Sequence, residues 1–148
     1  MRKANQMAPR NDPYKNFKFR VEIDNLTSAG FSECSGLESE VGCIEYREGG
    51  DHITRKLPGL HKVGDITLKR GVTKSAELYD WHKNIVNGVS DRRNGSIILL
   101  DDDGSDAVRW KFWDGFPRKY EGPSFNAKGN DVAIEALVIC CERIERES

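Results

Sequence analysis

Apolar and polar residues alternate without a break from Phe17 to Asp24. The apolar members of this series are Phe17, Phe19, Val21 and Ile23, and the polar members are Lys18, Arg20, Glu22 and Asp24. Successive side chains of an extended strand point to opposite faces, so a period of two predicts a β-strand with one buried face and one charged face.

Further strand patterns follow, separated by residues that favour turns. We expect them at residues 31–35, 40–46, 53–57, 63–69, 97–100, 108–113 and 132–144. Residues 25–28 are typical of a turn, so residues 31–35 are expected to return along the first strand. Residues 114–130 contain Pro117, Pro123 and several glycines, which favours a long connection.

One helix is expected, because apolar residues recur at spacings of three and four and form one stripe. The stripe consists of Leu78, Trp81, His82, Ile85, Val86 and Val89. Thr73 or Ser75 is a candidate N-cap, and Gly88 a candidate C-terminal stop. Together with about seven strands, this pattern predicts a single mainly β domain over residues 1–148, a β-sandwich or barrel-like fold with one packed helix.

Residues 46–60 form a charged segment with a Gly49-Gly50-Asp51 turn and a Pro58-Gly59 stop, and we expect an extended hairpin arm there. Such a segment is a poor core and suits contact with another subunit. Residues 1–13 are polar and expected to be flexible. The candidate inter-subunit contacts are Arg47, Glu48, Asp51, Arg55, Lys56 and Tyr14.

The composition narrows the function classes. A formal net charge of -1 is unlike that of a typical duplex-binding protein, which carries a basic excess on one face. No apolar run reaches the roughly 20 residues of a membrane-spanning helix. The N-terminus lacks the apolar region of a signal peptide, so synthesis and residence in the cytoplasm are expected. Cys34, Cys43, Cys140 and Cys141 are expected to be buried, reduced thiols.

Known catalytic and metal-binding motifs fit the sequence poorly. The cluster of aspartates at residues 101–106 lacks the glycine and glutamate positions of an EF-hand and is better explained as a hairpin turn. Residues 59–64 have the glycine spacing of a P-loop, but Asp65 stands where lysine is required. His52, His61 and His82 have no marked nucleophile beside them. We therefore expect no enzyme, no catalytic residue, no cofactor and no metal site.

Several segments, taken together and in order, resemble the tail tube proteins of contractile phages and phage-like contractile injection systems. The resemblance runs from about Asp12 to the C-terminus and is specific as a collinear set. Its main segments are Asp12-Pro13-Tyr14-Lys15-Asn16-Phe17-Lys18-Phe19, Phe31-Ser32-Glu33-Cys34-Ser35-Gly36-Leu37, Tyr46-Arg47-Glu48-Gly49-Gly50, Arg55-Lys56-Leu57-Pro58-Gly59-Leu60 and Ile66-Thr67-Leu68-Lys69-Arg70-Gly71.

The resemblance implies a non-enzymatic inner tube subunit. Members of this family form hexameric rings that stack into a hollow tube, with a β-barrel lining the lumen. The implied partners are other copies of the chain, the sheath protein, baseplate and tail-terminator proteins, and transient DNA or protein cargo. The residues considered as lumen-facing are Lys18, Arg20, Glu22 and Asp24, because they share one strand face.

Two alternatives stay open within the same fold. One is a tube-initiator or baseplate adaptor present in few copies, and the other is a ring protein of the type VI secretion apparatus. The compact chain favours the main subunit over the adaptor. The segment from Asp12 to Phe19 and the Leu57-Pro58-Gly59 turn resemble the tail tube group more than the type VI proteins.

Overall fold

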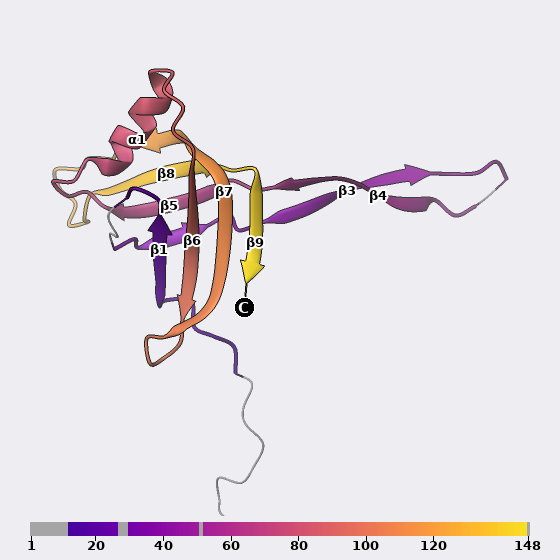
Figure 1. Cartoon of the computed structure of the whole chain (residues 1–148), viewed down its shortest axis with the longest axis horizontal. Helices are drawn as coiled ribbons and strands as arrows, with labels where there is room; N and C mark the ends of the chain where they lie inside the picture. The colour runs from indigo at the N-terminus through magenta and orange to yellow at the C-terminus, as the bar shows by residue number, and fades with distance from the viewer. Residues whose placement is uncertain (1–11, 27–29, 51, 148) are drawn as a thin grey trace, which may run out of the picture.

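The computed structural model of the chain describes residues 12–26, 30–50 and 52–147. Within these ranges it contains nine strands and one helix (Figure 1). In chain order they are β1 (Phe19–Ile23), β2 (Glu33–Ser35), β3 (Ser39–Tyr46), β4 (Arg55–Val63), β5 (Ile66–Gly71), α1 (Glu77–Val86), β6 (Arg93–Leu100), β7 (Asp106–Glu121), β8 (Ile134–Cys140) and β9 (Arg143–Glu147). Residues 1–11 of the expected N-terminal segment, part of the expected turn at 25–28, and Asp51 lie outside the described residues.

Seven antiparallel strands form one strongly bent sheet, in the order β1-β6-β7-β8-β5-β2 with β9 also paired to β7. β1, β6, the first half of β7 and β9 make one layer. The second half of β7, β8, β5 and β2 make the other. Figure 1 shows the strands of the two layers crossing, with β7 curving from one layer into the other. A mainly β, sandwich-like fold with one helix is therefore confirmed.

The alternation in β1 has the expected consequence, because Val21 and Ile23 are buried while Glu22 is exposed. The predicted pairing of residues 31–35 with this strand is wrong. β1 pairs with β6, with Val21 opposite Ile97, and β2 pairs with β5. A local pattern specifies the faces of a strand, whereas its neighbour depends on which distant apolar face completes the core.

β7 turns a corner that the sequence pattern concealed. It continues through Pro117 to Glu121, so the predicted connection over residues 114–130 is wrong in its first half. Asp114 takes a positive φ of 55° at the corner, and the predicted strand at 132–144 breaks there into β8 and β9. Pro117 is tolerated because this part of β7 pairs with a strand on one side only.

The helix is shorter than its apolar stripe. Leu78 and Trp81 are buried, but Val86 and Val89 are exposed because the last turn passes the edge of the core. Ala76 occupies the N-cap position without a side-chain cap, so neither predicted cap residue serves there. The predicted stop is confirmed: Gly88 has a φ of 80°, and the next amide donates to the carbonyl of Asn84 at 2.9 Å, as in a Schellman motif.

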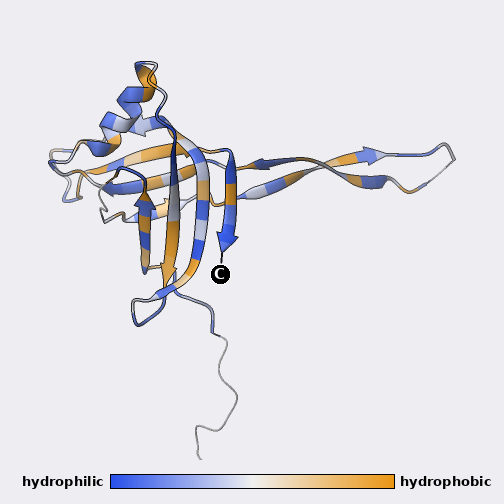
Figure 2. Ribbon diagram, viewed as in Figure 1, coloured by the Kyte–Doolittle hydropathy of each residue, from blue (hydrophilic) through white to orange (hydrophobic). Residues whose placement is uncertain are grey.

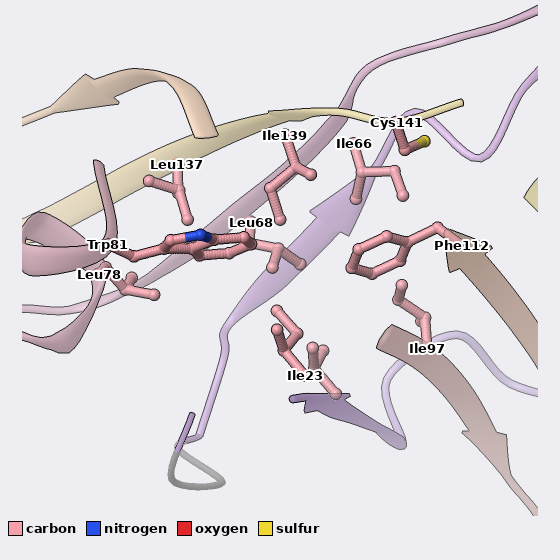
Figure 3. Packing of buried hydrophobic residues seen from close by; sticks show 11 residues of the cluster. Ile23, Ile66, Leu68, Leu78, Trp81, Ile97, Phe112, Leu137, Ile139 and Cys141 are labelled. Carbon is pink, nitrogen blue, oxygen red and sulfur yellow. The ribbon is translucent and has the colours of Figure 1, made fainter. Parts of the chain in front are cut away.

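The core lies between the two layers and is closed at one end by α1. Figure 3 shows the Trp81 ring and the Phe112 ring towards opposite sides of this cluster, with aliphatic side chains between them. Burying each large aliphatic or aromatic side chain contributes about 1.5–3 kcal/mol. The cluster comprises Val21, Ile23, Ile66, Leu68, Leu78, Trp81, Ile97, Phe112, Leu137, Ile139 and Cys141.

The four cysteines are free thiols in different environments. Cys141 is buried and Cys34 and Cys140 are half-buried, but Cys43 is exposed on β3, where the prediction of burial is wrong. Burial raises the pKa of the Cys34 and Cys141 thiols to about 11. The exposed Cys43 lies on β3, which pairs with β4 in a separate two-stranded sheet.

Candidate self-assembly interface

β3 and β4 form a two-stranded antiparallel arm that projects from the body (Figure 1). All eight residues of β3 and seven of the nine residues of β4 are exposed. At about 3.3 Å per residue, a strand of this length reaches roughly 25 Å. The arm comprises residues 39–63, which extends the expected hairpin at 46–60 towards the body.

The arm is a direct continuation of the body sheet. The register of the β2–β5 ladder, with Ser35 opposite Thr67, continues on the far side of a corner with Ser39 opposite Val63. Gly36 forms this corner with a φ of 91°, and a Cβ placed on it would lie 1.9 Å from the carbonyl oxygen of Asp65. Because the corner is so close-packed, the direction of the arm is set by the body.

The Pro58-Gly59 segment forms an irregularity within β4. Val41 pairs with His61 and Cys43 with Pro58, so β4 holds one residue more than β3 between these pairs. This is a β-bulge, which increases the local twist of a strand. Pro58 is accommodated because each arm strand has one unpaired edge. The Pro58-Gly59 pair, which the sequence predicted to end a strand, therefore marks a β-bulge within β4.

One face of the arm carries a cluster of apolar side chains, which we call the apolar arm face: Ile44, Tyr46 and Leu57. Ile44 and Leu57 are direct cross-strand partners, and Tyr46 lies two residues along the same strand. Their side chains are 52%, 39% and 49% exposed, in the order Ile44, Tyr46 and Leu57. Apolar positions are visible along the arm in Figure 2. Sequence reasoning emphasised the charges of this segment and missed these residues, although the alternation of Ile44 and Tyr46 was a usable signal.

Four of the predicted contact residues lie together on the arm. Arg55 and Lys56 begin β4, opposite Tyr46 and Glu45, and Arg47 and Glu48 follow directly after β3. These side chains are all exposed.

Tyr14 is separate from the arm. It lies against the body in a groove of about 380 Å³ together with Phe19, Leu37 and Trp110. The structure therefore groups the four described charged candidates on the arm and places Tyr14 on another surface.

Two of the four candidate lumen residues lie in a lattice of ion pairs on the outer face of the first layer. Arg20 pairs with Glu22 at 2.9 Å and with Asp106 at 3.1 Å, and Arg109 contacts the same two carboxylates at 3.7 and 3.3 Å. The hydrogen bond to Glu22 is the largest cause that raises the pKa of Arg20. Exposed pairs of this kind contribute little to stability, but they leave this part of the surface nearly neutral.

The other two lumen candidates lie at the ends of β1. The Nζ of Lys18 donates to the carbonyl oxygen of Asp102 at 3.0 Å. The backbone amide of Asp24 donates to the carbonyl oxygen of Asn94 at 3.0 Å. Lys18 and Asp24 therefore flank the ion-pair lattice.

A buried polar cluster joins three strands of the second layer. Arg70 on β5 pairs with Glu135 on β8 at 2.9 Å, and the Tyr120 hydroxyl on β7 donates to the same carboxylate at 2.6 Å. Burial, followed by the Glu135 contact, raises the pKa of Tyr120 to about 12. Sequence reasoning missed this cluster, although Arg70 continues the inward alternation of Ile66 and Leu68.

Side chains with catalytic or metal-binding potential are dispersed. Residues 101–105 form the expected turn between β6 and β7, where the Asp103 carboxylate accepts from the amide and hydroxyl of Ser105. These bonds, the side-chain bond first, lower the pKa of Asp103. Within the described ranges there is no group of three His, Cys, Asp or Glu residues suited to hold a metal ion.

The described histidines are dispersed in the same way. His61 shares a hydrogen bond with Ser39 at the base of the arm, and the Nδ1 of His82 donates to the carbonyl of Pro117. In the part of the chain that the structure describes, no helix is long and apolar enough to cross a membrane.

Comparisons with known structures place this architecture among tube proteins. The chain is 28% identical to a chain of the PVC sheath-tube complex in the extended state, an extracellular contractile injection system, over 93% of each chain with a TM-score of 0.82. It is 25% identical to a chain of the anti-feeding prophage tube terminating cap, over 100% of this chain and 99% of that chain, with a TM-score of 0.85. Hcp1 from Flavobacterium johnsoniae shares the fold alone, at 16% identity over 86% of this chain and 93% of that chain, with a TM-score of 0.56.

A comparison with curated protein sequences gave no match. The family described as T4-like virus tail tube protein gp19 matches residues 15–145. This match covers nearly all of the chain, including the arm and both layers of the sheet. The chain therefore belongs to the T4-like virus tail tube protein family and is a structural tube subunit of a contractile injection system.

Proposed function

We propose that six copies of this chain form a ring, that the rings stack into a hollow tube, and that strands from all six copies line the lumen as a continuous β-barrel. Membership of the tail tube family supports this proposal. The similarity to chains from a sheath-tube complex and from a tube terminating cap supports it further. Contacts that repeat from copy to copy without closing produce filaments, which is the geometry that a growing tube needs.

The exposed arm is the observation that carries the proposal. An isolated two-stranded hairpin is at best marginally stable in water, yet this arm leaves Ile44, Tyr46 and Leu57 accessible. Contiguous exposed apolar side chains on a soluble protein mark sites of interaction. A second copy of the chain is the partner that self-assembly always supplies. The arm is therefore a surface that assembly completes.

The charged residues of the arm and its tip are proposed to pair across subunits. Their proximity to the apolar arm face supports this role for four of them, while Asp51 is included from its place in the sequence. Tyr14 is proposed as a second contact, on the body. The charged set consists of Arg47, Glu48, Asp51, Arg55 and Lys56.

The lumen wall is proposed to include the outer face of β1. Because its ion-pair lattice balances positive and negative charge, such a wall would not retain DNA or a protein cargo strongly. The proposed lumen-facing residues are Lys18, Arg20, Glu22 and Asp24.

The proposed partners are those of an inner tube: the sheath, a baseplate and a tube terminator. The solved relatives include chains from PVC structures of the sheath-tube complex and of the sheath/tube terminator. A role as a tube-initiator or baseplate adaptor is the second candidate, because such a protein would share the fold. Assembly in the bacterial cytoplasm and a non-enzymatic role complete the proposal.

Electron microscopy of the purified protein tests the central proposal. We expect rings of uniform diameter or tubes in negative stain. A monomer that forms neither at high concentration under any salt condition would contradict it. An initiator or adaptor would instead give single rings without tubes at every concentration.

Charge reversal tests the polar contacts of the arm. The double variant Arg55→Glu and Lys56→Glu should shorten or abolish tubes and leave the far-ultraviolet circular dichroism spectrum and melting temperature nearly unchanged, because both side chains are exposed. Lys83→Glu is the control, since it reverses an exposed lysine on α1, away from the arm. Tubes of normal length from the Arg55/Lys56 variant would remove these residues from the contact.

A further inference from the structure

A second exposed apolar surface lies near the ends of β5 and β8, and we call it the far-end patch: Val72, Phe125, Val132 and Ile134. Phe125 and Val132 are 87% and 73% exposed, which is unusual for side chains of this size. The amide of Val72 donates to the carbonyl of Ala133 at 2.9 Å, so the chain segments on either side of the patch are bonded together. A hollow of about 710 Å³ opens beside it, lined by Ser124, Asn126, Gly129, Asp131, Val132 and Ile134.

The arm and the far-end patch lie at opposite ends of the same strands. β5 begins at Ile66, directly after the arm, and ends at Gly71, where a Cβ would lie 3.7 Å from Val132. Figure 1 shows the arm leaving one side of the body while β5 ends and β8 begins at the other side. The molecule therefore has a projection with an apolar face at one end and an exposed apolar patch beside a hollow at the other.

We infer that the apolar arm face of one copy docks on the far-end patch of the next copy. This inference rests on the proposed self-assembly and adds the receiving surface. In a head-to-tail contact, a projection meets the surface that faces the opposite way on the neighbouring copy. The far-end patch meets this condition, because it is apolar, exposed and lies at the end of β5 opposite the arm.

The charges near the two surfaces are also compatible. Arg55, which lies opposite Tyr46 and shares its face of the arm, places a positive charge beside the apolar arm face, and Asp131 places a negative charge in the lining of the hollow. The groove that contains Tyr14 is the competing receiver. It includes Leu37 at the base of the arm, so it adjoins the arm, whereas a head-to-tail contact uses the opposite end of the molecule.

Cross-linking in assembled particles tests the inference. In a Cys43→Ser background, Leu57→Cys is combined with Val132→Cys, and the particles are treated with a short bismaleimide near neutral pH. We expect a ladder of covalent oligomers, with each single variant giving mainly monomer. The thiols of Cys34 and Cys141 react slowly because their raised pKa leaves little thiolate, and Cys140 is common to all samples.

A parallel pair, Leu57→Cys with Tyr14→Cys, tests the competing groove. A ladder from this pair and none from Leu57→Cys with Val132→Cys would overturn the inference in favour of the groove. Electron microscopy of the same samples distinguishes a failure of the docking inference from a failure of the proposed function. Rings or tubes without the 57–132 ladder overturn the inference alone, whereas particles that never form in the Cys43→Ser background or the unaltered chain overturn the proposed function as well.

Discussion

At the scale of single residues, one glycine fixes the direction of the arm. Gly36 has a φ of 91° and approaches the backbone of Asp65 so closely that no Cβ fits. Glycine adopts this conformation at no steric cost, whereas other residues are strained there. The Gly36 corner therefore couples the arm to the body sheet through the backbone alone.

Replacing this glycine tests the coupling. Gly36→Ala should lower the free energy of unfolding by about 1–3 kcal/mol or more, through the strained φ and the clash with Asp65. Thermal unfolding followed by circular dichroism measures the effect. The matched control is Gly49→Ala near the arm tip, where a Cβ meets nothing within 4 Å. Equal melting temperatures for the two variants would show that the corner is not constrained.

The buried Arg70–Glu135–Tyr120 cluster makes a prediction about pH. Tyr120 has a pKa raised from 10.0 to about 12, so its neutral form is favoured in the folded state. The stability that this preference contributes is present below pH 10 and is lost as the pH rises towards 12. Tyr120→Phe should therefore flatten the decline in stability between these values, as measured by urea unfolding. An identical decline in Tyr120→Phe and in the unaltered chain would argue against the cluster.

At the scale of elements, the sequence was informative where a pattern is local. The faces of β1, the turn at residues 101–106 and the helix stop at Gly88 all follow from neighbouring residues. The course of β7 does not, because Pro117 signals a break in a local reading and is tolerated only where one strand edge is unpaired. The buried Arg70 was missed for the same reason, since its partners Glu135 and Tyr120 are distant in sequence. For the candidate interface, the charges of the arm were visible, but the bulge at Pro58-Gly59 concealed its full length.

The apolar arm face makes a prediction at this scale. Ile44→Asp should weaken assembly, because it places a charge in an interface that excludes water. The protein concentration required to form rings should rise by about tenfold or more. Its melting temperature as a monomer should change little, since Ile44 is half exposed and lies outside the core cluster. Sedimentation velocity measures the proportions of monomers and of assembled rings. Val86→Asp, at an exposed apolar residue of α1, is the control, and an equal loss of assembly in both variants would deny the arm a special role.

At the scale of the whole molecule, the asymmetry between arm and far-end patch allows a test by mixing. A variant whose residues 40–62 are replaced by an Asn-Gly turn joins Ser39 to Val63, which are already cross-strand partners, and retains every residue of the core cluster. Such a copy can receive an arm but offers none. In one case, arms join neighbours within a six-membered ring. When one copy in ten lacks the arm, only about half of the rings should then have every contact, because each ring contains six copies. If arms join successive rings instead, the same mixture should give complete rings and shorter tubes. Counting rings and measuring tube lengths in negative stain separates these outcomes, and normal rings with normal tubes at every mixing ratio would mean that the arm joins neither.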